Sequence, residues 1–328
     1  MKKKVLYYNI DDTLDYERQL LREWAIPDIE LVEVKDYEKK KDFVDHARDA
    51  EGVVVEYQQI TREILAQLPR LKIVALQSIG VDHVDLQAAT DHGVCVTNCP
   101  GFCSEEVALH AVGMMIDLVR KITMHDRSVR RGMWNPLYGY KTYRLSGRTV
   151  GLYFFGSIPQ AMMPMLRALQ VRVLVYAPTK SRAFLRRFGA EKVETFDELL
   201  MQSDILSLHC PLIPATTHLI SERELKMMKG SAFLVNTSRG RVVDEAALAE
   251  AIREGEIRAA AVDVIEDEMT EKSPLFALEN TVITPHSAFV SEDSFYSARK
   301  IALQQLVRRL HKQERPANLV NQDIIIQG

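Results

Sequence analysis

The chain has 328 residues, of which 47% are hydrophobic and 27% charged, as is usual for a globular protein with more than one domain. Its formal net charge of −3 gives no electrostatic reason to expect a nucleic acid or an anionic membrane as a partner. The apolar run that follows Lys2-Lys3-Lys4 is too short for a signal peptide or a membrane span. We therefore expect a cytoplasmic protein.

Four cysteines, Cys95, Cys99, Cys103 and Cys210, are consistent with a reducing compartment. The first three are spaced by four residues, which could indicate a metal site. Pro100-Gly101 interrupts this segment and no fourth ligand lies nearby in the sequence. We expect buried thiols and no metal.

Apolar runs alternate with amphipathic stretches along the chain, which is typical of βαβ units and parallel sheets. The first series predicts strands over residues 4–9, 53–57, 73–77 and 94–97, with helices over 11–24, 38–49 and 61–68. A second series predicts strands over residues 149–155, 172–176, 205–209, 232–236, 260–264 and 281–284. We predict two sheets, with a candidate hinge at residues 98–101.

Two long helices complete the prediction. Residues 105–122 form a mostly apolar stretch, so we expect a buried helix between domains or between subunits. A second helix, over about residues 291–312, has no strands of its own and should pack back on the first domain.

Three polar residues follow predicted strands: Arg239, Glu268 and His286. Because residues after the carboxyl ends of parallel strands line the ligand crevice, we expect these side chains in one cleft. The set suits proton-coupled chemistry on a substrate that carries a carboxylate. Arg239 would clamp the carboxylate, and His286 would exchange a proton while Glu268 orients it.

A dinucleotide-binding turn should follow the first strand of the second series. The G-x-G-x-x-G frame places glycines at 154, 156 and 159, but only Gly156 is glycine; the others are Phe154 and Pro159. Gly156 is the position that lets the backbone approach a pyrophosphate, and Ser157 could cap the next helix. Two interpretations stay open: a phosphate site that is kept, and one that is weakened by the added bulk.

The next predicted strand ends at Ala177, where an NAD enzyme usually has an acid for the ribose hydroxyls. Lys180 and Arg182 follow, which would suit the 2′-phosphate of NADP, or they are ordinary surface cations. The sequence leaves NAD and NADP open.

The chain resembles the D-isomer-specific 2-hydroxyacid dehydrogenases over nearly its whole length. The segments that carry the resemblance are Ser78-Ile79-Gly80-Val81-Asp82, Leu208-His209-Cys210-Pro211-Leu212, Val235-Asn236-Thr237-Ser238-Arg239-Gly240 and Thr284-Pro285-His286. The glycine turn is the one serious mismatch, and Leu109 stands where the family often has a Glu.

The resemblance implies an α/β protein with two Rossmann-like domains, the first discontinuous and flavodoxin-like. We expect residues 1–100 with 287–328 to form the substrate domain and residues 101–286 the dinucleotide-binding domain. A homodimer would form through the helix at 105–122 and the arm after it.

The resemblance also implies a reaction, the NAD(P)-dependent interconversion of a 2-oxo acid and a D-2-hydroxy acid. Ser78, Ile79, Gly80 and Arg239 would bind the substrate, with Arg239, Glu268 and His286 catalytic. The implied cofactor residues are Gly156, Ser157, Ile158, Cys210, Pro211, Thr216, Thr237 and Asp263, the last holding the nicotinamide amide. A nucleotide-sensing binding protein or a pseudoenzyme on the same fold is the alternative. The sequence does not name the 2-hydroxy acid.

Overall fold

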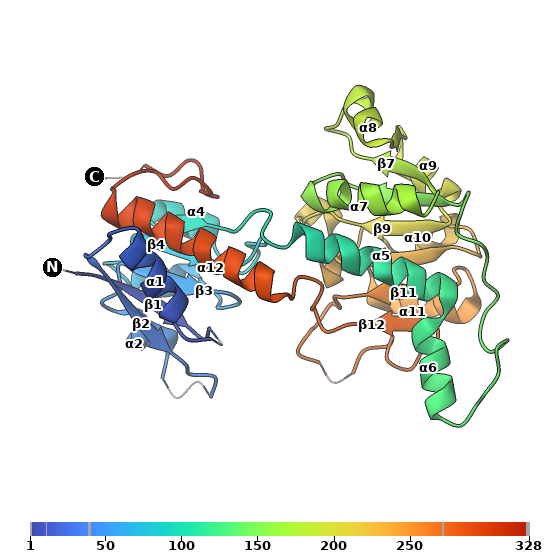
Figure 1. Cartoon of the computed structure of the whole chain (residues 1–328), viewed down its shortest axis with the longest axis horizontal. Coiled ribbons are helices and arrows are strands. Elements are labelled where there is room, and N and C mark those ends of the chain that lie inside the picture. The colour runs from blue at the N-terminus through green and yellow to red at the C-terminus, as the bar shows by residue number, and fades with distance from the viewer. Residues whose placement is uncertain (1, 11, 39–40, 271, 326–328) are drawn as a thin grey trace. The chain divides into compact units, whose positions relative to one another are not determined.

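The computed structural model describes residues 2–10, 12–38, 41–270 and 272–325. It divides into two compact units: unit 1 comprises Met1–Phe102 with Ser291–Gly328, and unit 2 comprises Cys103–Val290. Unit 1 is therefore built from two separate segments of the chain. The element labels are those of Figure 1.

Unit 1 is a five-stranded parallel sheet in the order β2-β1-β3-β4-β5, which is the flavodoxin-like order. Its elements are β1 (Lys3–Tyr8), α1 (Asp15–Glu23), β2 (Ile29–Val34), α2 (Phe43–Ala47), β3 (Gly52–Val55), α3 (Arg62–Ala66), β4 (Ile73–Leu76), α4 (Leu86–Asp91), β5 (Cys95–Thr97) and α12 (Glu292–Leu306). A π-helical turn, Val307–His311, ends α12. Strands β3 and β4 in the middle of the sheet consist of buried apolar residues, and α12 packs on β4 and α1 (Figure 1).

Two details of unit 1 differ from the sequence-based prediction. Residues 29–34, for which no strand was predicted, form β2 at the edge of the sheet beside β1; this strand stays half-exposed and so lacks the continuous apolar run of a buried strand. The helix expected over 38–49 is only Phe43–Ala47, because Asp42 before it is extended. Residues 11, 39 and 40, within the expected helices, lie outside the described residues.

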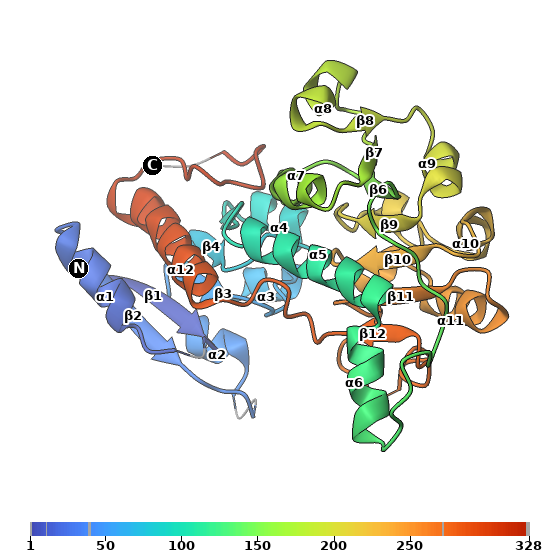
Figure 2. The same cartoon turned by 45° about the vertical axis from the view of Figure 1, so that its right-hand side comes forward.

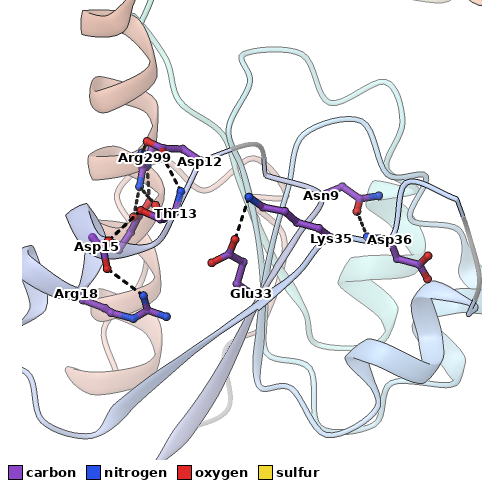
Figure 3. A network of polar contacts seen from close by, with 10 residues as sticks. Asn9, Asp12, Thr13, Asp15, Arg18, Glu33, Lys35, Asp36 and Arg299 are labelled. Carbon is purple, nitrogen blue, oxygen red and sulfur yellow. Dashed lines mark hydrogen bonds and ion pairs between the residues drawn. The ribbon is translucent and has the colours of Figure 1, made fainter.

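An ion cluster around the buried Arg299 joins the C-terminal helix to the N-terminal segment of unit 1 (Figure 3). Arg299 of α12 makes two hydrogen bonds to the fully buried carboxylate of Glu17, one of them at 2.7 Å, and another to Asp12 at 2.6 Å. The rings of Tyr16 and Tyr296 lie 5.4 and 5.7 Å from the guanidinium carbon. Burial opposes the charge of Arg299, but the hydrogen bonds to Glu17 and Asp12 outweigh it and raise the Arg299 pKa.

Unit 2 is a seven-stranded parallel sheet in the order β12-β11-β10-β9-β6-β7-β8, the doubly wound arrangement of Rossmann domains. Its strands are β6 (Thr149–Tyr153), β7 (Arg172–Tyr176), β8 (Glu191–Lys192), β9 (Ile205–Leu208), β10 (Phe233–Asn236), β11 (Ala259–Val262) and β12 (Thr281–Ile283). Its helices are α5 (Ser104–Arg120), α6 (Ile122–Arg130), α7 (Ser157–Ala168), α8 (Arg182–Phe188), α9 (Phe196–Gln202), α10 (Glu222–Met227) and α11 (Glu245–Glu254). The predicted fold class, two doubly wound parallel sheets, is confirmed.

Helices cover both faces of the unit 2 sheet. The apolar helix α5 lies beside α7, as Figures 1 and 2 show, and packs on β10 and β11. Helices α9, α10 and α11 supply side chains to the separate apolar core on the opposite face. Both cores are built from hydrophobic side chains. Polar side chains that could bind a ligand are therefore expected at the edge of the sheet where the strands end.

Candidate active site in unit 2

The strand register of unit 2 brings three loops to one edge of the sheet. Asn236 pairs with Val262, and Val262 pairs with Ile283, so β10, β11 and β12 end level with one another. The segments that follow these strands carry Arg239, Glu268 and His286. All three residues therefore lie on loops that leave the same carboxyl edge of the sheet.

The turn that carries Arg239 is organised by the buried amide of Asn236. Its Oδ1 accepts hydrogen bonds from the N–H of Ser238 at 3.0 Å and from its hydroxyl, while its Nδ2 donates to the Arg239 carbonyl at 2.9 Å. The amide therefore fixes the backbone on both sides of residue 238.

Gly240 joins this turn to the next loop. A Cβ atom on Gly240 would lie 1.8 Å from the carbonyl oxygen of Ile265, so only glycine permits this approach of two backbones. Arg239 is thereby held next to the loop that carries Glu268.

The three acidic residues Glu266-Asp267-Glu268, which follow β11, each make a different contact. Glu266 accepts a hydrogen bond from the N–H of Glu245, and Glu245 accepts one from the N–H of Glu266, so the loop is fastened to the start of α11. Asp267 accepts a bond within its own turn, from the N–H of Met269. The Glu268 carboxylate reaches His286, with Oε2 and Nδ1 2.8 Å apart.

His286 lies in an unusual backbone conformation, with φ at 51°. Its N–H donates to the Asp263 carbonyl at 2.7 Å, and Phe289 lies edge-on to the imidazole with ring centroids 6.1 Å apart. Strained conformations of this kind persist where the surroundings dictate them, often at functional sites.

Asp263 is 2% exposed, and its carboxylate accepts hydrogen bonds from other groups of the protein. It accepts hydrogen bonds from the N–H groups of Ser287 at 2.9 Å and Ala288 at 3.0 Å, and from the Thr284 hydroxyl at 2.5 Å. His110 of α5 reaches the same hydroxyl at 3.0 Å. Sequence reasoning missed His110, because nothing in a helical sequence shows which strand end it will meet.

The turn after β6 departs from one expectation. Gly156, not Ser157, is the N-cap of α7, and no side chain caps the helix, so the expected capping by Ser157 is wrong. Ser157 and Ile158 are the first two helical residues, and Pro159 is buried in the first turn. Proline is tolerated there because that N–H has no partner within the helix.

The loop after β9 meets this turn where the strand order reverses, between β6 and β9. Burial lowers the pKa of His209 to about 3 and raises the pKa of the Cys210 thiol to about 11. The Thr216 hydroxyl closes the same loop by donating to the Pro211 carbonyl at 2.7 Å. Within the described residues, His209 Nδ1 and, after β10, Thr237 Oγ1 are buried without a hydrogen-bond partner.

The expected substrate loop lies in unit 1, after β4. The Ser78 hydroxyl donates to the Gly80 carbonyl at 2.8 Å, and Asn98 donates to the Ile79 carbonyl at 2.8 Å. The N–H of Cys99 donates to the Ser78 carbonyl. Within the described residues, no hydrogen bond from the N–H groups of Ile79 and Gly80 to another protein atom is found, so both could donate to a carboxylate.

The cations after β7 have partners within unit 2. Arg182 donates to the Glu194 carboxylate at 2.9 and 2.5 Å, and Lys180 Nζ lies 5.3 Å from the centre of the Phe184 ring. Ala177 is buried. No acid therefore occupies the position after β7, and the nearby cations are already engaged.

Neither a metal-ligand cluster nor a membrane span was found in the part of the chain that the structure describes. No three His, Cys, Asp or Glu side chains there are grouped to hold a metal ion. No helix there is long and apolar enough to cross a membrane.

Comparison with known proteins gives one consistent result. Residues 112–288 match the model of the D-isomer specific 2-hydroxyacid dehydrogenase NAD-binding domain. A glyoxylate reductase of Thermococcus litoralis is 37% identical over 274 residues, covering 81% of this chain and 82% of that protein. The D-lactate dehydrogenase of Aquifex aeolicus, solved with NAD and lactic acid, superposes with a TM-score of 0.83 at 26% identity, covering 97% of this chain and 99% of that one.

An acyclic imino acid reductase solved with NADPH and D-Arg superposes with a TM-score of 0.84 at 26% identity, covering 97% of this chain and 99% of that one. Proteins of the same architecture thus include one solved with NAD and one solved with NADPH.

The fold and the matches define a dehydrogenase that uses a nicotinamide dinucleotide. The chain belongs to the D-isomer-specific 2-hydroxyacid dehydrogenase family, so the expected family, enzyme class and cofactor class are confirmed. Nothing in the comparisons favours the binding-protein or pseudoenzyme alternative.

Proposed function

We propose that the chain reduces a small 2-oxo acid to the D-2-hydroxy acid, and catalyses the reverse oxidation, with His286 and Glu268 as the proton-exchanging pair. The contact of 2.8 Å between His286 Nδ1 and Glu268 Oε2 carries this proposal. A carboxylate on Nδ1 fixes the orientation of the imidazole ring. The proton exchanged with the substrate oxygen would then be the one on Nε2.

Arg239 would bind the substrate carboxylate and polarise the keto oxygen, because a guanidinium presents a fork of donors. In unit 1, the backbone N–H groups of Ile79 and Gly80 would donate to a substrate carboxylate. In the reduction, the keto carbon gains a hydride and the keto oxygen gains the proton from His286. In the oxidation, neutral His286 accepts the hydroxyl proton.

The residues at the carboxyl edge of the unit 2 sheet fit a dinucleotide. The unpartnered Thr237 Oγ1 and His209 Nδ1 are buried polar atoms, within the described residues, that a ligand could satisfy. The N–H groups of Ser157 and Ile158 at the start of α7 would hold the pyrophosphate, with Cys210 and Pro211 lining the site. When bound, the nicotinamide supplies or accepts the hydride.

Asp263 would act through the loop that carries His286. Its carboxylate already accepts from Thr284, Ser287 and Ala288, which supports a positioning role and leaves Oδ2 the oxygen with spare accepting capacity toward a nicotinamide amide.

We propose that both coenzymes bind. The missing acid after β7 removes the usual contact to the ribose hydroxyls and also the repulsion of a 2′-phosphate. Arg182 is the cation that a 2′-phosphate would recruit, in competition with Glu194. Glu194→Gln should therefore lower the Kd of NADPH and leave that of NADH unchanged.

We further propose a cytoplasmic homodimer formed through α5, α6 and the arm at residues 131–147. Large apolar side chains are exposed there: Leu109, Ile122, Trp134 and Leu137. Trp134 and Leu137 are 86% and 85% exposed, which is costly for an isolated subunit. Four buried free thiols suit a reducing compartment. Light scattering should give twice the chain mass, and Trp134→Ala with Leu137→Ala should give the monomer.

Turnover tests the central proposal directly. NADH or NADPH oxidation is followed with glyoxylate and with pyruvate, and the product configuration is determined by chiral chromatography. We expect the D-hydroxy acid where the product is chiral, and a loss of about 10²–10⁴ in kcat for His286→Ala with coenzyme Kd nearly unchanged. An unaltered kcat in this variant would remove His286 from the mechanism.

A further inference from the structure

Phe154 occupies a backbone conformation that normally belongs to glycine. It follows β6 directly and has φ at 76°, in the left-handed region. An aromatic residue is an outlier there, because its Cβ approaches the following carbonyl oxygen. The dinucleotide frame has its first glycine at this position. With Phe154 in place of that glycine, the turn keeps the same backbone conformation, but the conformation is strained.

The two ends of the turn hold this conformation in place. The N–H of Phe154 donates to the carbonyl of Tyr176 at 2.9 Å, which ties the turn to β7. The next residue, Phe155, is fully buried against Phe184 and Phe188. With Phe155 anchored in the core, the side chain of Phe154 must leave on the other side, where it is 37% exposed.

The Phe154 ring lies over the open side of Gly156. A Cβ atom on Gly156 would have Cε1 of Phe154 at 3.4 Å and Cδ1 at 3.7 Å as its nearest neighbours. In a dinucleotide site the middle glycine is there to leave this space open for the pyrophosphate. The ring therefore stands in the space that the missing side chain of Gly156 provides.

We propose that the Phe154 ring covers the phosphate-binding turn in the nucleotide-free enzyme and is displaced when a dinucleotide binds, so that it sets the coenzyme affinity. This inference rests on the proposed function, which requires a dinucleotide at α7. The partly exposed ring swings aside by rotation about χ1, while Phe155 and the Tyr176 contact keep the backbone in place. The free energy needed to move the ring weakens the binding of any ligand that carries a pyrophosphate.

Two substitutions separate the ring from the backbone strain. Phe154→Ala removes the ring but leaves a Cβ in the left-handed conformation, whereas Phe154→Gly removes both. Phe276→Ala is the matched control, because Phe276 is a 49% exposed phenylalanine of unit 2 outside this turn. NADH binding is measured by fluorescence titration, ADP binding by calorimetry, and thermal stability by the Tm of the nucleotide-free proteins.

We expect both Phe154 variants to bind NADH and ADP about tenfold more tightly than the unsubstituted enzyme, which corresponds to about 1.4 kcal/mol. Phe154→Gly should melt above Phe154→Ala, since only glycine relieves the strain, and Phe276→Ala should bind as the unsubstituted enzyme does. Binding by the variants that is unchanged, weaker or undetectable would overturn the inference.

The outcomes distinguish this inference from the proposed function. An enzyme that turns over 2-oxo acids but gains no affinity in either variant keeps the function and loses the role of Phe154. A chain that turns over nothing, but binds ADP more tightly in both variants, keeps the role of Phe154 and loses the function.

Discussion

The N–H of His286 donates a hydrogen bond of 2.7 Å to the carbonyl oxygen of Asp263, and this bond joins the ends of β12 and β11 at the candidate active site. The Asp263 carboxylate then accepts from Ser287 and Ala288, so one residue holds the backbone on both sides of the imidazole. The position of His286 therefore depends on a buried carboxylate.

Removal of the Asp263 carboxylate should loosen the loop that carries His286. Asp263→Ala leaves the loop over residues 284–288 without three hydrogen bonds, so kcat should fall about 10²-fold, the loss typical of a misplaced catalytic group. Hydrogen exchange of that loop should accelerate in the nucleotide-free protein. A rise in NADH Kd with unchanged exchange would instead indicate that Asp263 acts on the coenzyme alone. Asp263→Asn, which keeps one acceptor, should be intermediate.

The Glu268 carboxylate is the hydrogen-bond partner of His286 Nδ1. Glu268→Gln keeps the shape but replaces the carboxylate that holds His286 Nδ1 by a neutral amide, so kcat for reduction should fall about 10–10²-fold with little effect on coenzyme binding. Steady-state kinetics checks this, with Asp267→Asn as the control, since Asp267 bonds within its own turn. Equal losses in both variants would mean that the loop is sensitive as a whole.

Gly240 should tolerate no side chain. A Cβ would overlap the Ile265 carbonyl at 1.8 Å, so Gly240→Ala must push the Arg239 turn away from the Glu268 loop. We expect a loss of about 1–3 kcal/mol in the free energy of unfolding, together with a lower kcat/KM. Urea unfolding measures the first quantity. Gly113→Ala is the control, because a Cβ there meets nothing within 4 Å and alanine favours its helix.

His209 makes stability depend on pH. Burial lowers its pKa to about 3, against about 6.5 in the unfolded chain, so the unfolded state binds more protons between these values. Stability should therefore fall as the pH drops from about 6.5 toward 3, with a slope approaching about 1.4 kcal/mol per pH unit. Urea unfolding at several pH values should show this slope reduced in His209→Asn and unchanged in His92→Asn, which alters an exposed histidine.

The Arg299 cluster should stabilise unit 1. Arg299→Met strands the Glu17 carboxylate, which is 0% exposed, and should cost about 3–5 kcal/mol in the free energy of unfolding. The double variant Arg299→Met with Glu17→Leu should recover much of this loss, because no unpaired charge is left buried. A double variant as unstable as the single one would show that packing of the tyrosines on Arg299 matters more than charge.

The strand runs and the placing of Arg239, Glu268 and His286 after strand ends were readable from the sequence. Buried parallel strands must be apolar, and their carboxyl ends must meet at one edge, so spacing along the chain predicts a shared site. The contact between Glu268 and His286 follows from this topology. The edge strand β2 could not be predicted in this way, because it is half-exposed and carries two glutamates.

Four features were decided only by the tertiary structure: the positive φ of Phe154, the approach of Gly240 to Ile265, the burial of Asp263 and the reach of His110 to Thr284. Each depends on atoms brought together from distant positions. Local sequence fixes which conformations a residue tolerates, whereas the packing around it selects one, even a strained one. The residues capable of the chemistry were therefore determined by the sequence, and their orientation and the access to them by the fold.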